Sequence, residues 1–137
     1  MHLEPMISLS VTMRPVDIGT TPVGHRMNLE LEGDTDPDSR LQGHLTGVDY
    51  LTVRSDGVLD LNVHATLRRP EGGVVALRGS GLATRTPDGA ARGQLALRFE
   101  TAAEDLAFLN QTLGIAVTTA DMTRGTLHIS GFSLVDD

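Results

Sequence analysis

The stretch LDLNVHATLR, residues 59–68, decides the fold class of this chain. Its apolar side chains occupy every second position, and its polar side chains fill the positions between them. Successive side chains of a β-strand point to opposite faces, so this segment predicts a strand with one apolar and one polar face. The apolar face is expected to be dry.

The same alternation returns along most of the chain. It covers residues 7–14, 27–32, 51–54, 95–100 and 127–130. Turn sequences separate the runs, and Asp56-Gly57 between two of them is a typical hairpin signal. Many short strands with frequent turns predict an all-β fold. We expect a closed or nearly closed antiparallel β-barrel of about eight or more strands, formed by residues 1–137 as a single domain.

One segment departs from this pattern and predicts a short helix over Ala102–Leu113. Thr101 and Glu104 have the spacing of a capping box, and Gly114 is a typical helix stop. The apolar stripe of this helix consists of Leu106, Leu109 and Leu113. We expect the stripe to lie over the barrel or to plug one of its ends.

The composition narrows the range of functions. The 137 residues carry a formal charge of −7, and all 11 basic residues are arginines. Such an acidic chain lacks the basic face of a nucleic-acid-binding protein. Cysteine is absent, which excludes disulfides, thiolate nucleophiles and zinc–thiolate sites. We expect no cofactor.

Two features of the chain bear on its location. Residues 1–5 do not begin a signal peptide, and no apolar stretch approaches the ~20 residues of a membrane span. We therefore expect a soluble, cytoplasmic protein without a membrane partner.

The main structural question is whether the apolar face of the strands points into the barrel or out of it. If this face points inward, its side chains fill a barrel that has room for one small ligand. If it points outward, other subunits must cover it, and the protein is a homo-oligomer. The sequence favours the inward arrangement and leaves a homo-oligomer possible.

Several short motifs, in a shared order, resemble a known family. Residues 18–26, IGTTPVGHR, are similar to a "G-x-T-P-x-G-x-R" run, and residues 40–43, RLQG, to "R-L-x-G". Residues 49–58, DYLTVRSDGV, are similar to "D-W-x-x-V-R-x-D-G-V". The runs at 98–101 and 109–110 are similar to "F-E-T" and "W-L-N".

Together these motifs resemble the DUF3237 family of small β-barrel proteins. The resemblance implies a barrel of the calycin or allene-oxide-cyclase kind, an architecture that also hosts cofactor-free cyclases and isomerases. It implies no particular reaction. The chain departs from the family at two positions. It has Tyr50 where family members often have Trp, and Asn62 where many members have Asp.

Six residues are candidates for a site. We predict His64, Asp49 and Arg54 as catalytic residues, because an imidazole or a carboxylate can move a proton and an arginine can polarise an oxyanion. Asp49 has two other interpretations, as an arginine's partner or as a turn residue. The predicted substrate-binding residues are Arg40, Tyr50 and Asn62.

These candidates are expected to gather at one region of the barrel. Sequential strands usually pair, and residues 40–64 form successive strands with short turns. If the apolar side chains fill the interior, however, this polar set lies outside unless it sits at an open mouth, beneath a loop or against another subunit. We predict no metal site, because the five histidines lack metal-ligand spacing and the acidic loop at 34–38 lacks the glycine and glutamate of a calcium loop.

The leading functional prediction is a small-molecule-binding barrel that acts as a cofactor-independent isomerase, cyclase or lyase on a small apolar organic substrate. One alternative is a non-catalytic carrier or sensor that uses the same pocket. The other is a structural subunit whose interior is packed shut.

Overall fold

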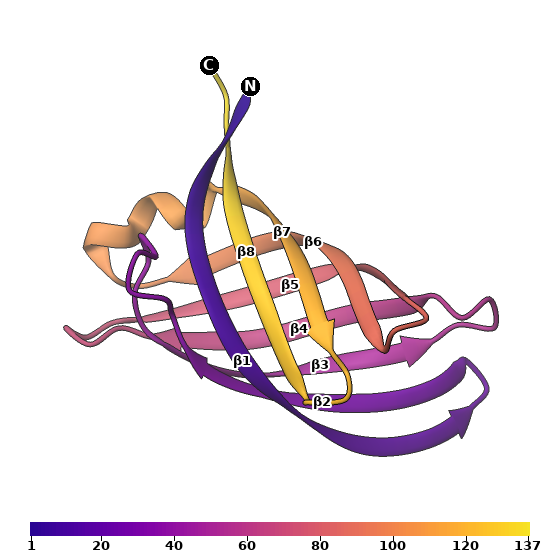
Figure 1. Ribbon diagram of the computed structural model, residues 1–137. Coiled ribbons are helices and arrows are strands. Elements are labelled where there is room, and N and C mark those ends of the chain that lie inside the picture. Colours follow the sequence, from indigo (N-terminus) through magenta and orange to yellow (C-terminus); the bar gives the residue numbers. More distant parts are fainter.

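The computed structural model describes residues 1–137 and consists of eight antiparallel strands and one short 3-10 helix. The strands are β1 (His2–Thr21), β2 (Gly24–Asp34), β3 (His44–Val53), β4 (Leu59–Arg68), β5 (Val74–Arg85), β6 (Ala90–Thr101), β7 (Leu113–Asp121) and β8 (Thr126–Val135). Each strand pairs with the next one along the chain, and β8 pairs with β1 (Figure 1). The prediction of a closed or nearly closed antiparallel β-barrel is confirmed.

The apolar positions of the alternating runs point into the ring. In β4, the stretch that decides the fold, every apolar residue from Leu59 to Leu67 is buried, and the polar residues between them lie on the outer face. The core contains 24 buried hydrophobic residues drawn from strands β1 to β7, the helix and the β2–β3 loop, and Leu127 and Ile129 of β8 pack against it. The inward arrangement is therefore the correct one.

Strand β7 has the reverse pattern. Its larger side chains, Leu113, Ile115 and Val117, are exposed on the outer face, whereas Ala116 and Ala120 are buried inside. Pairing with β6 and β8 fixes this direction, since Ala116 lies opposite the buried Leu95 in the β6 ladder. Small residues on this wall leave space inside the ring.

The helix η1 (Glu104–Gln111) is shorter than predicted and is 3-10 rather than α. The capping-box prediction is wrong, because no side chain caps the helix and residue Ala103 occupies the N-cap. Leu106 and Leu109 are three residues apart, so the three-residue turn of a 3-10 helix places both toward the barrel. The third residue of the predicted stripe, Leu113, belongs to β7 and is exposed.

Asn110 fixes the ends of this helical segment to β6. Its Oδ1 accepts a hydrogen bond from the Thr101 backbone N–H at 2.8 Å, and its Nδ2 donates to the Thr101 carbonyl at 3.0 Å. The helix lies across one end of the barrel, where Leu109 is fully buried (Figure 1). The structure contains no helix with the length and apolar character that a membrane crossing requires.

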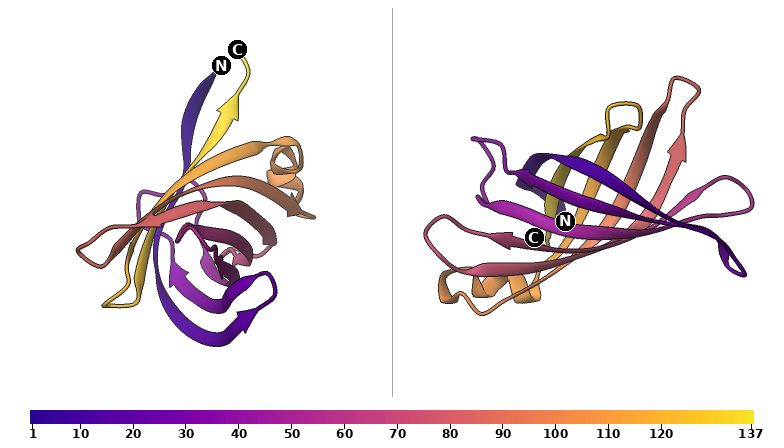
Figure 2. Two further views of the ribbon diagram at one scale, coloured as in Figure 1. Left: turned by 90° about the vertical axis from the view of Figure 1, so that its right-hand side faces the viewer. Right: turned by 90° about the horizontal axis from the view of Figure 1, so that it is seen from below.

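The two ends of the barrel differ. The helix and the β2–β3 loop cover one end, and the two chain termini lie together beyond it (Figure 2). At the opposite end the β1–β2 hairpin extends past the neighbouring strands (Figure 1). The IGTTPVGHR motif forms the tip of this hairpin.

Candidate functional site

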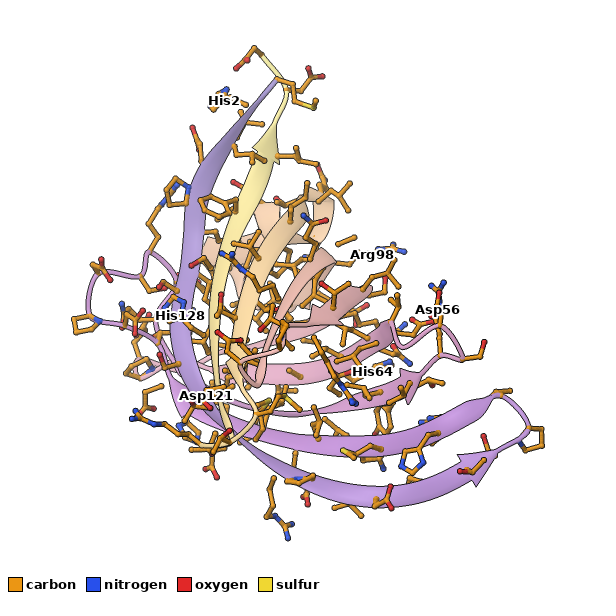
Figure 3. The ribbon with its side chains drawn as sticks, turned by 45° about the vertical axis from the view of Figure 1, so that its right-hand side comes forward. His2, Asp56, His64, Arg98, Asp121 and His128 are labelled. Atoms are coloured by element: carbon orange, nitrogen blue, oxygen red, sulfur yellow. The ribbon has the colours of Figure 1, made fainter.

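Three of the six predicted site residues meet on the outer face of β3 and β4. The rings of Tyr50 and His64 pack edge to face, with centroids 5.6 Å apart and an interplanar angle of 86°. His64 Nε2 lies 3.2 Å from Asn62 Oδ1. All three side chains are exposed, and Figure 3 shows where His64 lies on the barrel.

Arg54 belongs to the β3–β4 turn instead. Its Nη2 donates to Asp56 Oδ2 at 2.7 Å, and Asp56 Oδ1 also accepts the backbone N–H of Val58 at 3.1 Å. The hydrogen bond from Val58 N–H is the main cause that lowers the pKa of the Asp56 carboxyl, and the hydrogen bond from Arg54 lowers this pKa further. These contacts stabilise the turn and orient Arg54 away from the barrel interior.

Arg40 lies at the other end of the molecule. It is in the β2–β3 loop before the start of β3, whereas Arg54 follows the end of the same strand. A strand of ten residues spans about 33 Å, so the two arginines are far apart. Arg40 Nη1 lies 3.7 Å from Glu4 Oε2. The prediction that all six residues gather at one region is therefore wrong.

Asp49 points into the barrel. Strand β3 begins at His44 rather than at Leu51, which places Asp49 in mid-strand on the same inward side as Leu45 and Leu51. Only 6% of Asp49 is exposed. No arginine contacts it and it is not in a turn, so both structural interpretations of this residue are wrong.

The Asp49 carboxylate occupies a gap in the sheet. The β3–β4 ladder pairs Asp49 with Val63 and Thr52 with Asp60, but the two residue pairs between them are absent from the register. In the gap, Asp49 Oδ1 accepts the backbone N–H of Asn62 at 2.9 Å. The other oxygen, Oδ2, has no hydrogen-bond partner in the chain, and Asp49 is one of the residues that line the internal cavity.

Burial changes the acidity of this carboxyl group. Desolvation raises the pKa of Asp49 to about 6, and the Asn62 N–H opposes the rise. The negative charge of Asp60 makes a smaller contribution that also raises this pKa. Asp49 is therefore a weaker acid than an ordinary aspartate, and it lies beside an apolar cavity.

The cavity beside Asp49 is small and almost entirely apolar. It has a volume of about 60 Å³, and 19 of its 21 lining residues are hydrophobic. That is several times the space required by one water molecule and far less than the pocket of a drug-sized ligand. Met13 and Met122 line it, and their flexible side chains can adapt its shape.

Thr118 is the second polar residue that lines the cavity, and it was not among the residues predicted from the sequence. It lies on β7, is 7% exposed and makes no side-chain hydrogen bond. Gly93 on β6 leaves room for it, because a Cβ atom at Gly93 would lie 2.7 Å from Thr118 Oγ1. The alternation of small residues from Gly114 to Ala120 was the available signal, and the sequence analysis did not use it.

Several other charged groups pair on the surface. His44 contacts Asp34 Oδ1 at 2.7 Å and Glu32 Oε2 at 2.9 Å, and these carboxylates raise its pKa. Figure 3 places His2 near the chain termini and His128 on the side of the barrel formed by β8. No group of three or more histidines and carboxylates has the arrangement of a metal site.

The chain matches the model of one known protein family. A family model described as "Protein of unknown function (DUF3237)" matches residues 1–131. The chain belongs to the DUF3237 family. A search of curated proteins finds no match.

Solved structures share the DUF3237 fold at low sequence identity. A β-barrel-like protein from Acinetobacter baumannii AYE is 20% identical, with a TM-score of 0.84 over 98% of this chain and 96% of the other. A protein of unknown function from Clostridium acetobutylicum is 18% identical, with a TM-score of 0.85 over 98% and 100% of the two chains. A conserved protein of unknown function from Rhodopseudomonas palustris is 15% identical, with a TM-score of 0.79 over 98% and 99%.

The DUF3237 motifs take distinct places in this barrel. The segment 49–58 runs from the buried Asp49 through the β3–β4 turn, and the segment 40–43 lies in the loop at the helix-covered end. The departure at Asn62 leaves the cavity unchanged, because this side chain lies outside and only its backbone N–H reaches Asp49.

Proposed function

We propose that this barrel binds a small apolar organic molecule in its internal cavity and catalyses a cofactor-independent isomerisation, cyclisation or lyase step. Asp49 acts as the general acid and base. The observation that carries the proposal is a single buried carboxyl group, with a pKa of about 6 and one free oxygen, beside an otherwise apolar cavity.

The position of Asp49 suits proton transfer. A general base is most effective when its pKa lies near the working pH, and Asp49 meets this condition. The Asn62 N–H holds one carboxylate oxygen and leaves Oδ2 directed to the substrate. In an isomerisation, Oδ2 takes a proton from a C–H bond of the substrate, and the carboxylic acid returns that proton to another carbon atom.

The apolar lining supports the same role. Water is scarce among these hydrophobic side chains, so the carboxylate is poorly solvated and reactive. The walls also restrict the conformation of the substrate, which favours cyclisation. His64, Arg54 and Arg40 do not line the cavity, and the proposal gives them no part in the chemistry.

A carrier or sensor is the second candidate function. The observation that favours it is that Asp49 is the only ionisable group in the cavity, so no second acid or base assists it. A carrier would bind the same class of molecule and release it unchanged.

Isotope exchange in heavy water distinguishes these functions without knowledge of the substrate. The protein is incubated in D₂O with a mixed metabolite extract, and bound and free compounds are analysed by mass spectrometry. An enzyme that works through Asp49 gives a deuterated or rearranged compound, which is lost in Asp49→Asn and retained in the surface control Asp38→Asn. A carrier binds an unlabelled, unchanged compound. If nothing binds, the barrel is packed shut and the proposal is wrong.

A further inference from the structure

Two polar residues, Asp49 on β3 and Thr118 on β7, line the internal cavity from different strands. Asp49 Oδ2 and Thr118 Oγ1 have no hydrogen-bond partner in the chain, because the one side-chain bond of this pair is that of Asp49 Oδ1. In the ring of eight strands, β3 and β7 are separated by three strands on either side, so the two atoms belong to opposite walls. The other lining residues between them are hydrophobic.

The Thr118 hydroxyl belongs to a buried residue of the cavity wall and makes no hydrogen bond with another side chain. A buried hydroxyl without a hydrogen bond is unfavourable, and valine has nearly the same shape without that cost. The neighbouring wall accommodates Thr118 through Gly93, where even one methyl group would collide with Oγ1. A polar contact with a bound molecule would satisfy this hydroxyl.

The charge of the cavity restricts its ligand. None of the eleven arginines or five histidines lines it, so an anionic ligand would meet only the carboxylate of Asp49. An ammonium group has three donors, and the cavity offers too few acceptors to satisfy them. A buried charge without full pairing is strongly unfavourable, which leaves an uncharged ligand.

We infer that the cavity takes an electrically neutral, largely hydrocarbon molecule with polar groups at two separated positions. One group binds Asp49 Oδ2 and the other binds Thr118 Oγ1. This inference rests on the proposed function and names its substrate class. Thr118 is a specificity-determining residue in this arrangement.

A series of α,ω-alkanediols of increasing length tests the inference directly. Their binding is compared with that of 1-alkanols, alkanoates and alkylamines of equal chain length, by NMR titration of the methyl groups of Ala120, Leu61 and Leu95. Diols of one optimal length should bind about three- to tenfold more tightly than the matching alkanols, the usual effect of one added neutral hydrogen bond. Alkanoates and alkylamines should bind more weakly than the alkanols.

Variants of Thr118 identify the second contact. In Thr118→Val the diol and the alkanol should bind equally, whereas Thr118→Ser should keep the preference for the diol. Thr119→Val, one residue away on the outer face, is the matched control and should behave as the wild-type chain. Because Thr118→Val removes an unpaired hydroxyl, its melting temperature should not fall.

The outcomes separate this inference from the proposed function. If alkanols enter the cavity but diols show no advantage, the two-contact inference is wrong and the binding function stands. If alkanoates or alkylamines bind best, the inference of a neutral ligand is wrong. If no probe shifts the cavity methyl groups, both the inference and the proposed function are wrong.

Discussion

At the scale of single residues, Asp49 makes an unfavourable contribution to stability when it is ionised. The unfolded chain releases its proton near the ordinary pKa of 3.8, whereas the folded chain retains it up to a pKa of about 6. Between these values the native state binds more protons, so stability falls as the pH rises. Functional residues often carry such a cost.

Asp49→Asn should therefore change the dependence of stability on pH. The two chains should have similar stability near pH 4, and the variant should be more stable above pH 6, by up to about 3 kcal/mol. Urea unfolding from pH 4 to pH 8 measures this difference, and the subtraction removes the contribution of the other titrating groups. Asp38→Asn, an exposed position in the β2–β3 loop, is the control. A constant difference between wild type and Asp49→Asn over this range would contradict the assigned pKa.

At the scale of elements, alternation within a strand determines which side chains the barrel can accept. Leu61 and Asp60 are neighbours in β4, but Leu61 lines the cavity and Asp60 lies on the outer face. Their substitutions should have very different consequences.

Leu61→Asp should destabilise the fold by about 3–5 kcal/mol, because it buries an unpaired carboxylate in the chamber that already holds Asp49. Asp60→Ala should change stability by no more than about 0.5 kcal/mol. Thermal unfolding of both variants measures the contrast. Equal melting temperatures would show that the two faces of β4 are assigned wrongly.

The same alternation explains how much the sequence could predict. Period-two runs identified most of the strands and their buried faces, because those runs have large apolar side chains on one face. They did not identify β5 or β7. The large side chains of β7 are outside, because pairing with β6 and β8 determines the direction of its faces. Thr118 was missed for this reason.

Asp49 could have been placed correctly from the sequence. It has the same parity as Leu51 and Val53, which the alternation assigns to the inner face, but the expected strand began too late to include it. The helix was located and its type was not, because the Asn110–Thr101 hydrogen bonds that fix its ends join residues of different elements.

At the scale of the whole molecule, the barrel combines a wall of larger side chains with a wall of small ones. The small residues include Ala83, Ala91, Gly93 and Ala120, and they leave the space that forms the cavity. If this space serves a ligand, filling it should abolish binding and leave the fold intact.

Ala91→Val adds two methyl groups on the inner face of β6 beside the cavity. We expect it to reduce the binding of alkanol probes at least tenfold and to change the free energy of unfolding by no more than about 1.5 kcal/mol. Ala96→Val, on the outer face of the same strand, is the control and should leave binding unchanged. Unchanged probe affinity in Ala91→Val would place the ligand elsewhere.

The gap in the β3–β4 ladder has a consequence beyond the cavity. The backbone N–H of Asn62 donates the hydrogen bond that Asp49 accepts. The side chain of Asn62 contacts His64 on the outside of the barrel. One peptide group therefore connects the inner carboxyl group with the outer surface. The NMR chemical shift of the Asn62 amide should therefore change as Asp49 gains or loses its proton. A pH titration of this resonance would follow the protonation of the buried carboxyl group.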